Sequence, residues 1–207
     1  MPKLIWRFPD RPIEVFSLRM IDEGEYLCQK KADGYFAVII KDSDLKIFSR
    51  HNNKLSGVSP QMTEMIRALN LSDGDVLHGE WTSRREANRK EELYLFSWVY
   101  SKYEWLGGLA EEDRFNRLSS LKPTGDVHVI DSVTTGYAQM YKSTIDDYRY
   151  EGVVLKRRNS KLIGDLAKSV DNSSFLKVKW RSGCSAMTKR IIQDEDLKTR
   201  MTKEEGR

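Results

Sequence analysis

The stretch QKKADGYF, residues 29–36, places two adjacent lysines in front of an Asp-Gly pair. A hydrophobic tripeptide at 26–28 precedes it, and a run of strand-forming residues follows it. Such a stretch is either a surface turn with solvated charges or the setting of a lysine nucleophile. Because neighbouring residues of a strand face opposite sides, Lys30 and Lys31 would not both face the same site. Motifs elsewhere in the chain are needed to distinguish the two interpretations.

The composition predicts one globular domain over residues 1–207. The chain is long enough for one hydrophobic core of ordinary size, with 39% hydrophobic, 32% charged and 10% aromatic residues. No repeat, low-complexity tract or interdomain linker interrupts it. Residues 182–207 are polar and charged, and we expect a tail there, or a final helix over 188–201.

The net charge of +4 says little about a partner, but the charge is unevenly distributed. Ten basic residues lie between Lys156 and Arg190, against two acidic ones, Asp165 and Asp171. On charge alone, a solubilising face and a phosphate-binding surface are equally good interpretations.

The two cysteines and the N-terminus bear on location. Cys28 and Cys184 are far apart and form no CxxC pair, which favours a reduced, intracellular protein. The start of the chain lacks a secretory apolar segment, and no apolar run approaches the roughly 20 residues that a membrane crossing needs. We expect a cytoplasmic protein without a membrane partner.

The hydrophobic pattern predicts a mixed, mainly antiparallel α+β fold, in which helices interrupt the strands. Residues 29–34 are interpreted as a loop at the entrance of a strand, and Ser59 and Pro60 as the N-cap and first residue of a helix. The expected strands are 35–41, 45–49, 75–81, 92–100, 126–133, 151–157 and 174–180; the expected helices also include 111–121 and 137–148.

Four further motifs accompany KADG. They are HGEW with Glu80, LYLFSW with Phe96, EGVVLK with Glu151 and Lys156, and FLKVKW with Lys177 and Lys179. Lys31 precedes Glu80 by 49 residues, Glu151 follows after 71 more, and Lys177 after another 26. This order and these intervals, over residues 25 to 180, resemble the covalent nucleotidyltransferase superfamily of ATP-dependent DNA and RNA ligases and messenger RNA capping guanylyltransferases. The resemblance implies the ligase adenylation fold, with the nucleotide site between sheets.

The resemblance also implies a role for each matching residue. Lys31 would be the nucleophile and Lys30 a solvated neighbour, Asp33 would act in the sealing step, and Glu151 and Glu80 would hold the metal or the ribose. The implied nucleotide contacts are Gln29, Lys31, Glu80, Phe96, Lys156, Lys177 and Lys179, and Lys177 and Lys179 are also catalytic. Nucleic-acid contacts are expected at Arg50, Arg157, Arg158, Lys161, Lys168 and Arg181. The bland alternative for Phe96 is an ordinary core aromatic.

The chemistry of AMP transfer independently explains why residues of these types are needed. A lysine amine can attack the α-phosphate of ATP and hold AMP as a phosphoramidate, which divides one difficult step into easier ones. A free lysine with a pKa near 10.4 is almost entirely ammonium at neutral pH. We expect Lys177, Lys179 and a bound metal to depress the pKa of Lys31. Carboxylates such as Glu80 and Glu151 suit Mg²⁺, with Mn²⁺ as an alternative.

The chain also departs from the family pattern. Phe36 stands where many relatives have a polar ribose contact, Gln29 where many have Glu, and Ser97 where Asp often follows the stacking aromatic. Only 27 residues (207 minus 180) follow Trp180, too few for the OB-fold domain found after the last motif in DNA ligases and capping enzymes. The sequence therefore resembles a catalytic core that is either naturally minimal or a piece of a longer protein.

These features predict an ATP-dependent ligase that acts as a monomer on nicked duplex nucleic acid with 5'-phosphate and 3'-hydroxyl ends. The strands could be DNA, RNA or mixed, with a slight tilt towards RNA at one side of the nick. Two alternatives remain, a capping-type guanylyltransferase and a nucleic-acid end-binding protein without turnover.

Overall fold

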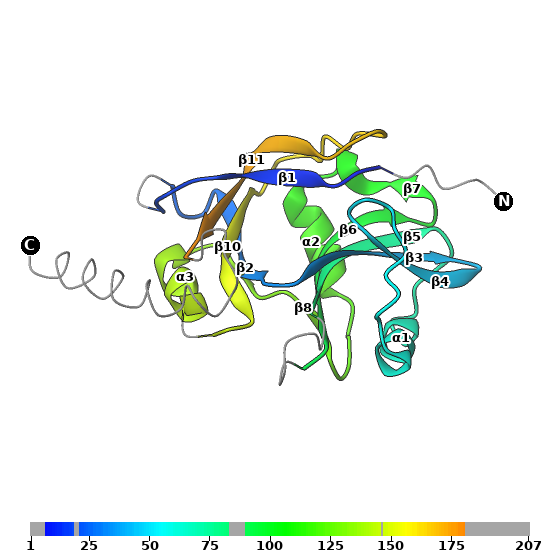
Figure 1. The fold of residues 1–207 in the computed structure, drawn as a ribbon. Coiled ribbons are helices and arrows are strands. Elements are labelled where there is room, and N and C mark those ends of the chain that lie inside the picture. The colour runs from blue at the N-terminus through cyan, green and yellow to red at the C-terminus, as the bar shows by residue number, and fades with distance from the viewer. Residues whose placement is uncertain (1–6, 19–20, 83–89, 146, 181–207) are drawn as a thin grey trace, which may run out of the picture.

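The computed structural model describes residues 7–18, 21–82, 90–145 and 147–180. Within these ranges the chain forms eleven strands, three α-helices and a short 3-10 helix, η1 (Leu106–Gly108). The strands make two sheets, which lie side by side in Figure 1. Antiparallel pairing dominates both sheets, so the predicted α+β class is confirmed.

The first sheet has the order β1-β11-β10-β2-β9. Its strands are β1 (Asp10–Glu14), β11 (Val170–Lys179), β10 (Tyr150–Arg157), β2 (Tyr26–Ala32) and β9 (Ser132–Val133). The outer pair, β1 and β11, is parallel, whereas the others are antiparallel. Helix α3 (Tyr137–Ile145) packs on one face of this sheet, where Tyr137 joins a buried cluster with Val153 and Leu155. The opposite face is left for the second sheet.

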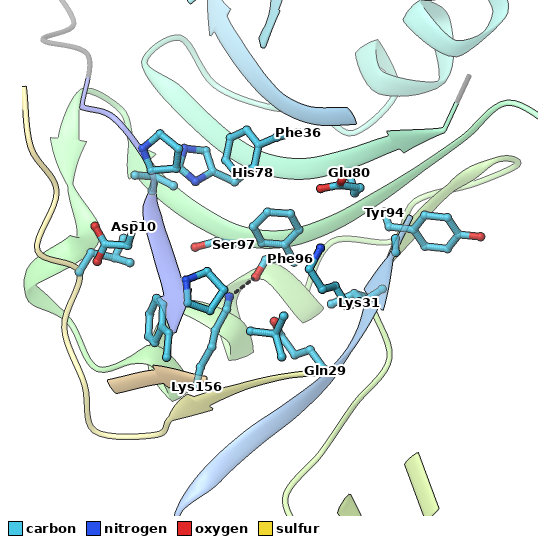
Figure 2. Close-up of a pocket in the computed structure, with 18 of the residues that line it drawn as sticks. Asp10, Gln29, Lys31, Phe36, His78, Glu80, Tyr94, Phe96, Ser97 and Lys156 are labelled. Carbon is cyan, nitrogen blue, oxygen red and sulfur yellow. Dashed lines mark hydrogen bonds between the residues drawn. The ribbon is translucent and has the colours of Figure 1, made fainter. Parts of the chain in front are cut away.

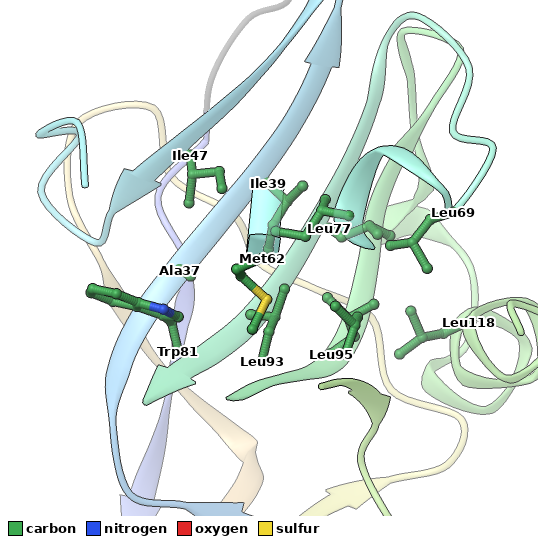
Figure 3. Packing of buried hydrophobic residues seen from close by; sticks show 12 residues of the cluster. Ala37, Ile39, Ile47, Met62, Leu69, Leu77, Trp81, Leu93, Leu95 and Leu118 are labelled. Atoms are coloured by element: carbon green, nitrogen blue, oxygen red, sulfur yellow. The ribbon is translucent and has the colours of Figure 1, made fainter. Parts of the chain in front are cut away.

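The second sheet has the order β4-β3-β5-β6-β7, and a further strand, β8, pairs in parallel with β6. Its strands are β3 (Tyr35–Asp42), β4 (Asp44–Ser49), β5 (Asp75–Thr82), β6 (Glu92–Ser101), β7 (Glu104–Trp105) and β8 (Val127–Val129). Helices α1 (Pro60–Arg67) and α2 (Glu111–Ser119) cover one face. Met62 of α1 and Leu118 of α2 pack there against Ile39, Leu77 and Leu95 in the largest core (Figure 3).

Local sequence signals explain several of these elements. The Ser59 hydroxyl accepts a hydrogen bond from the backbone N–H of Met62, and Pro60 opens α1, which confirms the predicted start of this helix. The β3–β4 hairpin is also confirmed, with Ser43 at a positive φ of 50° in its turn. The predicted helices at 111–121 and 137–148 begin where expected and end at Ser119 and Ile145.

Three expectations about the chain trace are wrong. Residues 29–32 belong to strand β2 instead of a loop, because β10 and β9 pair with β2 on its two sides. The predicted strand at 126–133 is two strands in different sheets, since the chain crosses from β6 to β2 at Ile130 and Asp131. Strand β1 was not expected at all.

The predicted C-terminal helix over 188–201 and Arg181 lie outside the described residues. In the part of the chain that is described, no helix combines the length and the apolar character required to span a membrane.

Candidate active site

A cavity lies between the two sheets and collects several of the residues that the sequence singled out (Figure 2). Gln29, Lys31 and Lys156 reach it from the first sheet, and Glu80 and Phe96 reach it from the second. Further lining residues are Phe8, Pro9, Asp10, Pro12, Phe36, Arg50, His78, Ser97, Val154 and Phe175. Residues spread over the whole chain thus converge on one site.

Lys31, Glu151 and Lys179 form a linked charge group on three neighbouring strands. Lys31 and Lys179 lie opposite Gly152 on either side of β10. The ammonium of Lys31 pairs with one carboxylate oxygen of Glu151, and Lys179 Nζ donates to the other at 2.9 Å. The Glu151 side chain is only 14% exposed, so little water screens the group. The carboxylate holds both lysines at the edge of the cavity.

The pKa values reverse one expectation. Burial lowers the pKa of Lys31, but the carboxylates of Glu80, Glu151 and Asp33 outweigh burial, and the pKa is raised. Lys177 and Lys179 do not depress it as predicted, because Lys179 bonds to Glu151 and carboxylates dominate around Lys31. The expected effect of a bound metal stays a prediction. For Glu151, burial raises the pKa and the two lysines lower it, with a net lowering. Lys31 is therefore held as an ammonium.

A β-bulge aims the Glu151 carboxylate towards Lys31. Tyr150 pairs with Ala32, and Gly152 with Lys31, so Glu151 is an extra residue in β10. Gly152 adopts a φ of +140°, and a Cβ there would collide with the backbone carbonyl of Val178. Only glycine fits this combination of backbone angle and close strand approach without strain. The backbone geometry thus explains why the second residue of the EGVVLK motif is glycine.

Lys30 faces away from Lys31, as expected, but it is not simply solvated. Its ammonium lies 2.7 Å from a carboxylate oxygen of Asp131 and 5.0 Å from the centre of the Tyr150 ring. Its side chain is 18% exposed. The expectation of a free surface lysine is wrong, because the chain crossing at 130–131 brings Asp131 beside β2.

A second bulge places Phe96 in the cavity. His78 pairs with Ser97, and Gly79 with Leu95, which leaves Phe96 as the extra residue of β6. The Phe96 ring meets the Phe36 ring edge-on, with 5.7 Å between their centres, and His78 completes this aromatic wall. The Arg50 guanidinium lies over the outer side of Phe36, 5.2 Å from the ring centre. Phe36, which replaces a polar residue of the family pattern, therefore packs in this wall.

Lys156 forms the buried floor of the cavity. Its ammonium donates to the carbonyl oxygen of Phe96 at 3.1 Å and to Glu111 Oε1 at 2.9 Å. Burial lowers the pKa of Lys156, and the Glu111 carboxylate offsets only part of that effect. Glu111 also pairs with Arg114 on α2, and both are fully buried. Glu111 and Arg114 were not expected in the site, because an EEDR stretch at a helix start is typical of an ordinary exposed helix.

Two polar side chains of the cavity wall have unused hydrogen-bonding atoms. Gln29 is 2% exposed and Ser97 is 4% exposed. Among the described residues, neither the amide nitrogen of Gln29 nor the hydroxyl oxygen of Ser97 has a hydrogen-bond partner. Because unsatisfied buried polar groups are costly, these atoms suit a polar ligand in the cavity.

The N-terminal strand, which the sequence analysis also missed, closes the cavity at the β11 edge. Phe8, Asp10 and Pro12 contribute to the lining. The Asp10 carboxylate accepts hydrogen bonds from the backbone N–H groups of Ile163 and Gly164 and from the side-chain amide of Asn172. A short apolar pattern interrupted by prolines gave no strand signal.

The residues expected to bind nucleic acid are dispersed. Arg157 pairs with Glu25 at 2.9 Å, and Arg158 pairs with Glu112 at 2.5 Å. Lys161 and Lys168 are exposed, and neither forms an ion pair with another described residue. The basic segment is thus partly neutralised by the protein itself.

The donor set near Lys31 suits a hard cation in one respect. Among the described residues, no group of three or more His, Cys, Asp or Glu side chains converges as a complete metal cage. The charges of Glu80 and Glu151 nevertheless act on each other and on Lys31. Mg²⁺ commonly uses only one or two carboxylates, with waters and substrate phosphates completing its shell. Glu151 and Glu80 fit that pattern.

Comparison with known proteins shows which solved structures have a similar fold. No protein-family model and no curated protein matched the sequence. The ligase domain of LigD from M. tuberculosis matches with a TM-score of 0.63 and 20% identity, over 83% of this chain and 60% of that one. A structure of Lig E DNA ligases matches with a TM-score of 0.58 and 18% identity, over 84% and 69%. A mycobacterial DNA ligase D complexed with ATP matches with a TM-score of 0.59 and 18% identity, over 83% and 60%.

At these identities the likeness is one of fold. This chain has the fold of the ATP-dependent DNA ligase catalytic domain, and it spans 60% to 69% of the lengths of the three structures.

Proposed function

We propose that this chain is an ATP-dependent polynucleotide ligase that carries AMP on Lys31. The observation that carries the proposal is the placement of Lys31 at the edge of the cavity, paired with Glu151, while Lys179 bonds the other oxygen of the same carboxylate. A lysine tied to a carboxylate that two cations share is held in a fixed position. The ligase-domain fold supports the same conclusion.

The proposed reaction has three transfers. The Lys31 ammonium gives a proton to water, and its amine attacks the α-phosphorus of ATP; a P–N bond forms, and the bond to pyrophosphate breaks. A 5'-phosphate oxygen of the nucleic acid then attacks the same phosphorus, and the P–N bond breaks to release Lys31. Finally a 3'-hydroxyl loses its proton and attacks the activated 5'-phosphate; a phosphodiester bond forms, and AMP leaves.

The cavity offers a place for each part of the nucleotide. The Phe96 ring can stack on a purine, and the Gln29 amide can hydrogen-bond to its edge. Lys177 and Lys179 carry positive charge for the phosphates. Glu151 and Glu80 would hold Mg²⁺, which would supply charge neutralisation at the phosphates.

We infer that the acceptor is a nick in a duplex, because a complementary strand holds the 5'-phosphate and the 3'-hydroxyl in place before the reaction. Asp33 follows Lys31 by two residues, which suits a role near the 3'-hydroxyl. Arg50, at the rim of the cavity, suits the 5'-phosphate, since its guanidinium can form a bidentate contact with phosphate oxygens.

The test is to incubate the protein with Mg²⁺ and labelled ATP, and to look for a covalent adduct on a denaturing gel. We expect an adduct in the wild type and in Lys30→Ala, and none in Lys31→Ala. Lys30 is a matched control because it is adjacent and its ammonium pairs with Asp131 instead of Glu151. An adduct that survives in Lys31→Ala would contradict the assignment. A panel of nicked duplexes with DNA or RNA on each side would then identify the acceptor.

A guanylyltransferase is the second candidate. The unpartnered amide nitrogen of Gln29 can donate to the carbonyl of a guanine as well as to a ring nitrogen of adenine. The same gel with labelled GTP separates the two donors. No adduct with either nucleotide would contradict both enzymes and favour an end-binding protein.

A further inference from the structure

Phe16 is the most exposed large hydrophobic side chain among the described residues. It is 98% exposed, whereas its neighbours Val15 and Leu18 pack against the buried cluster under α3. Leaving a phenylalanine entirely in water forgoes the stabilisation of burial. Since the residues around it are anchored, its outward direction is fixed by the local register.

Phe16 lies in a bend two residues beyond the end of β1, the strand that supplies one wall of the cavity. Along this segment Phe8, Asp10 and Pro12 line the cavity, and Glu14 lies 3.7 Å from the ammonium of Lys177. Its neighbour Val15 packs into the cluster under α3, so the chain is still anchored one residue before Phe16.

The pairing with β11 brings Phe16 out beside the late lysines. Glu14 is the register partner of Lys177, and the backbone N–H of Val15 donates to the carbonyl of Lys177 at 2.9 Å. The pairing of β1 with β11 ends there, and Phe16 is the residue that follows this last contact with Lys177.

This position is a short step from the proposed nucleophile. β1, β11, β10 and β2 are consecutive in the sheet, so three strand spacings, roughly 14 Å, separate the β1 edge from Lys31. Phe16 follows the end of this edge strand and is not among the residues that line the cavity.

We propose that Phe16 is a stacking contact for a base of the nucleic-acid strand that enters the site. The inference rests on the proposed function for the identity of that strand. Surfaces that hold single strands combine exposed aromatic rings with lysines along the backbone path. Here Lys177 and Lys179 each lie near a carboxylate, which reduces their attraction for phosphates. An exposed aromatic ring would add a contact to the bases. A phenylalanine ring forms no hydrogen bonds with base edges, so this contact would not depend on the base sequence.

The experiment measures binding of a labelled, 5'-phosphorylated nicked duplex by fluorescence anisotropy, without nucleotide, for the wild type and four variants. We expect Phe16→Ala and Phe16→Leu to bind on the order of tenfold more weakly, and Phe16→Trp to bind like the wild type, because only an aromatic ring stacks. Ile13→Ala is the matched control and should bind normally, since Ile13 is an exposed apolar residue of β1, 41% exposed.

Adduct formation with ATP is measured on the same variants. A wild-type level in Phe16→Ala, together with weak nucleic-acid binding, supports the proposal. Equal losses of adduct and of binding would instead indicate a structural role. If Phe16→Leu binds as well as Phe16→Trp, or if Phe16→Ala changes only self-association in sedimentation, stacking on a base is wrong.

These readouts keep the two proposals apart. Absence of an adduct in the wild type would contradict the ligase function, while the anisotropy of the nicked duplex would still report whether Phe16 contacts nucleic acid.

Discussion

The ammonium of Lys156 donates a hydrogen bond to the carbonyl oxygen of Phe96, the residue that bulges out of β6. A bulged residue leaves the regular ladder, and Lys156 supplies the partner that its carbonyl needs. Glu111 holds the other side of the ammonium. The direction of the Phe96 ring thus depends on an ion pair buried behind it.

This relationship predicts the effect of removing one partner. Glu111→Gln removes the carboxylate that Lys156 and Arg114 share, and we expect the free energy of unfolding to fall by about 3–5 kcal/mol, because two buried cations lose their partner. Denaturant unfolding measures the loss. The double variant Lys156→Met with Glu111→Gln should recover part of it, and no recovery would contradict the pairing argument.

Gly152 offers a prediction about strand geometry. Gly152→Ala forces a side chain into a positive-φ position against β11, and we expect a loss of about 1–3 kcal/mol in the free energy of unfolding. Adduct formation should also fall, since β11 carries Lys179. Gly108→Ala is the control, because a Cβ there meets no atom within 4 Å. Equal effects of the two substitutions on unfolding would contradict the role of Gly152.

The raised pKa of Cys28 predicts that the free energy of unfolding decreases at alkaline pH. Burial, and then the charge of Glu23, raises the pKa of this thiol from 9.0 to about 12. The folded state therefore keeps a proton that the unfolded state loses, and this contribution is full below pH 9 and disappears as the pH rises towards 12. At pH 10.5 the wild type should lose about 2 kcal/mol more than Cys28→Ala, relative to pH 8. Parallel losses in denaturant unfolding would contradict the shift.

The ion pairs of the basic segment predict which residues bind phosphates. Lys161 and Lys168 are exposed and unpaired among the described residues, whereas Arg157 and Arg158 are bound to carboxylates. Lys161→Ala and Lys168→Ala should each lower the salt slope of duplex binding by about 0.9. Arg157→Ala and Arg158→Ala should change it less. The reverse order, measured by titration at several salt concentrations, would contradict this assignment.

The sequence predicted the elements with strong local signals. The Ser59-Pro60 start of α1, the β3–β4 hairpin and the aromatic strand β6 all follow from propensity and turn chemistry. The convergence of Lys31, Glu80, Glu151 and Phe96 on one site was expected from the motif order, and the structure does bring them together.

Other features depend on pairing between distant segments, which no local pattern carries. Strand β1 exists because β11 is beside it, and the 126–133 segment divides because two sheets compete for it. The two bulges shift by one residue which side chains face the cavity, and the raised pKa of Lys31 results from the carboxylates that the bulge at Glu151 helps to gather.

The parallel pairing of β1 with β11 has a consequence for biosynthesis. Asp10 finds its partner Val170 only after 160 more residues (170 minus 10) have been made. At roughly 5–20 residues per second, the N-terminal segment waits at least about 8 s for the strand that fixes it. Until then the cavity lacks one wall, so we expect the cavity to be complete only when nearly all of the described chain has left the ribosome.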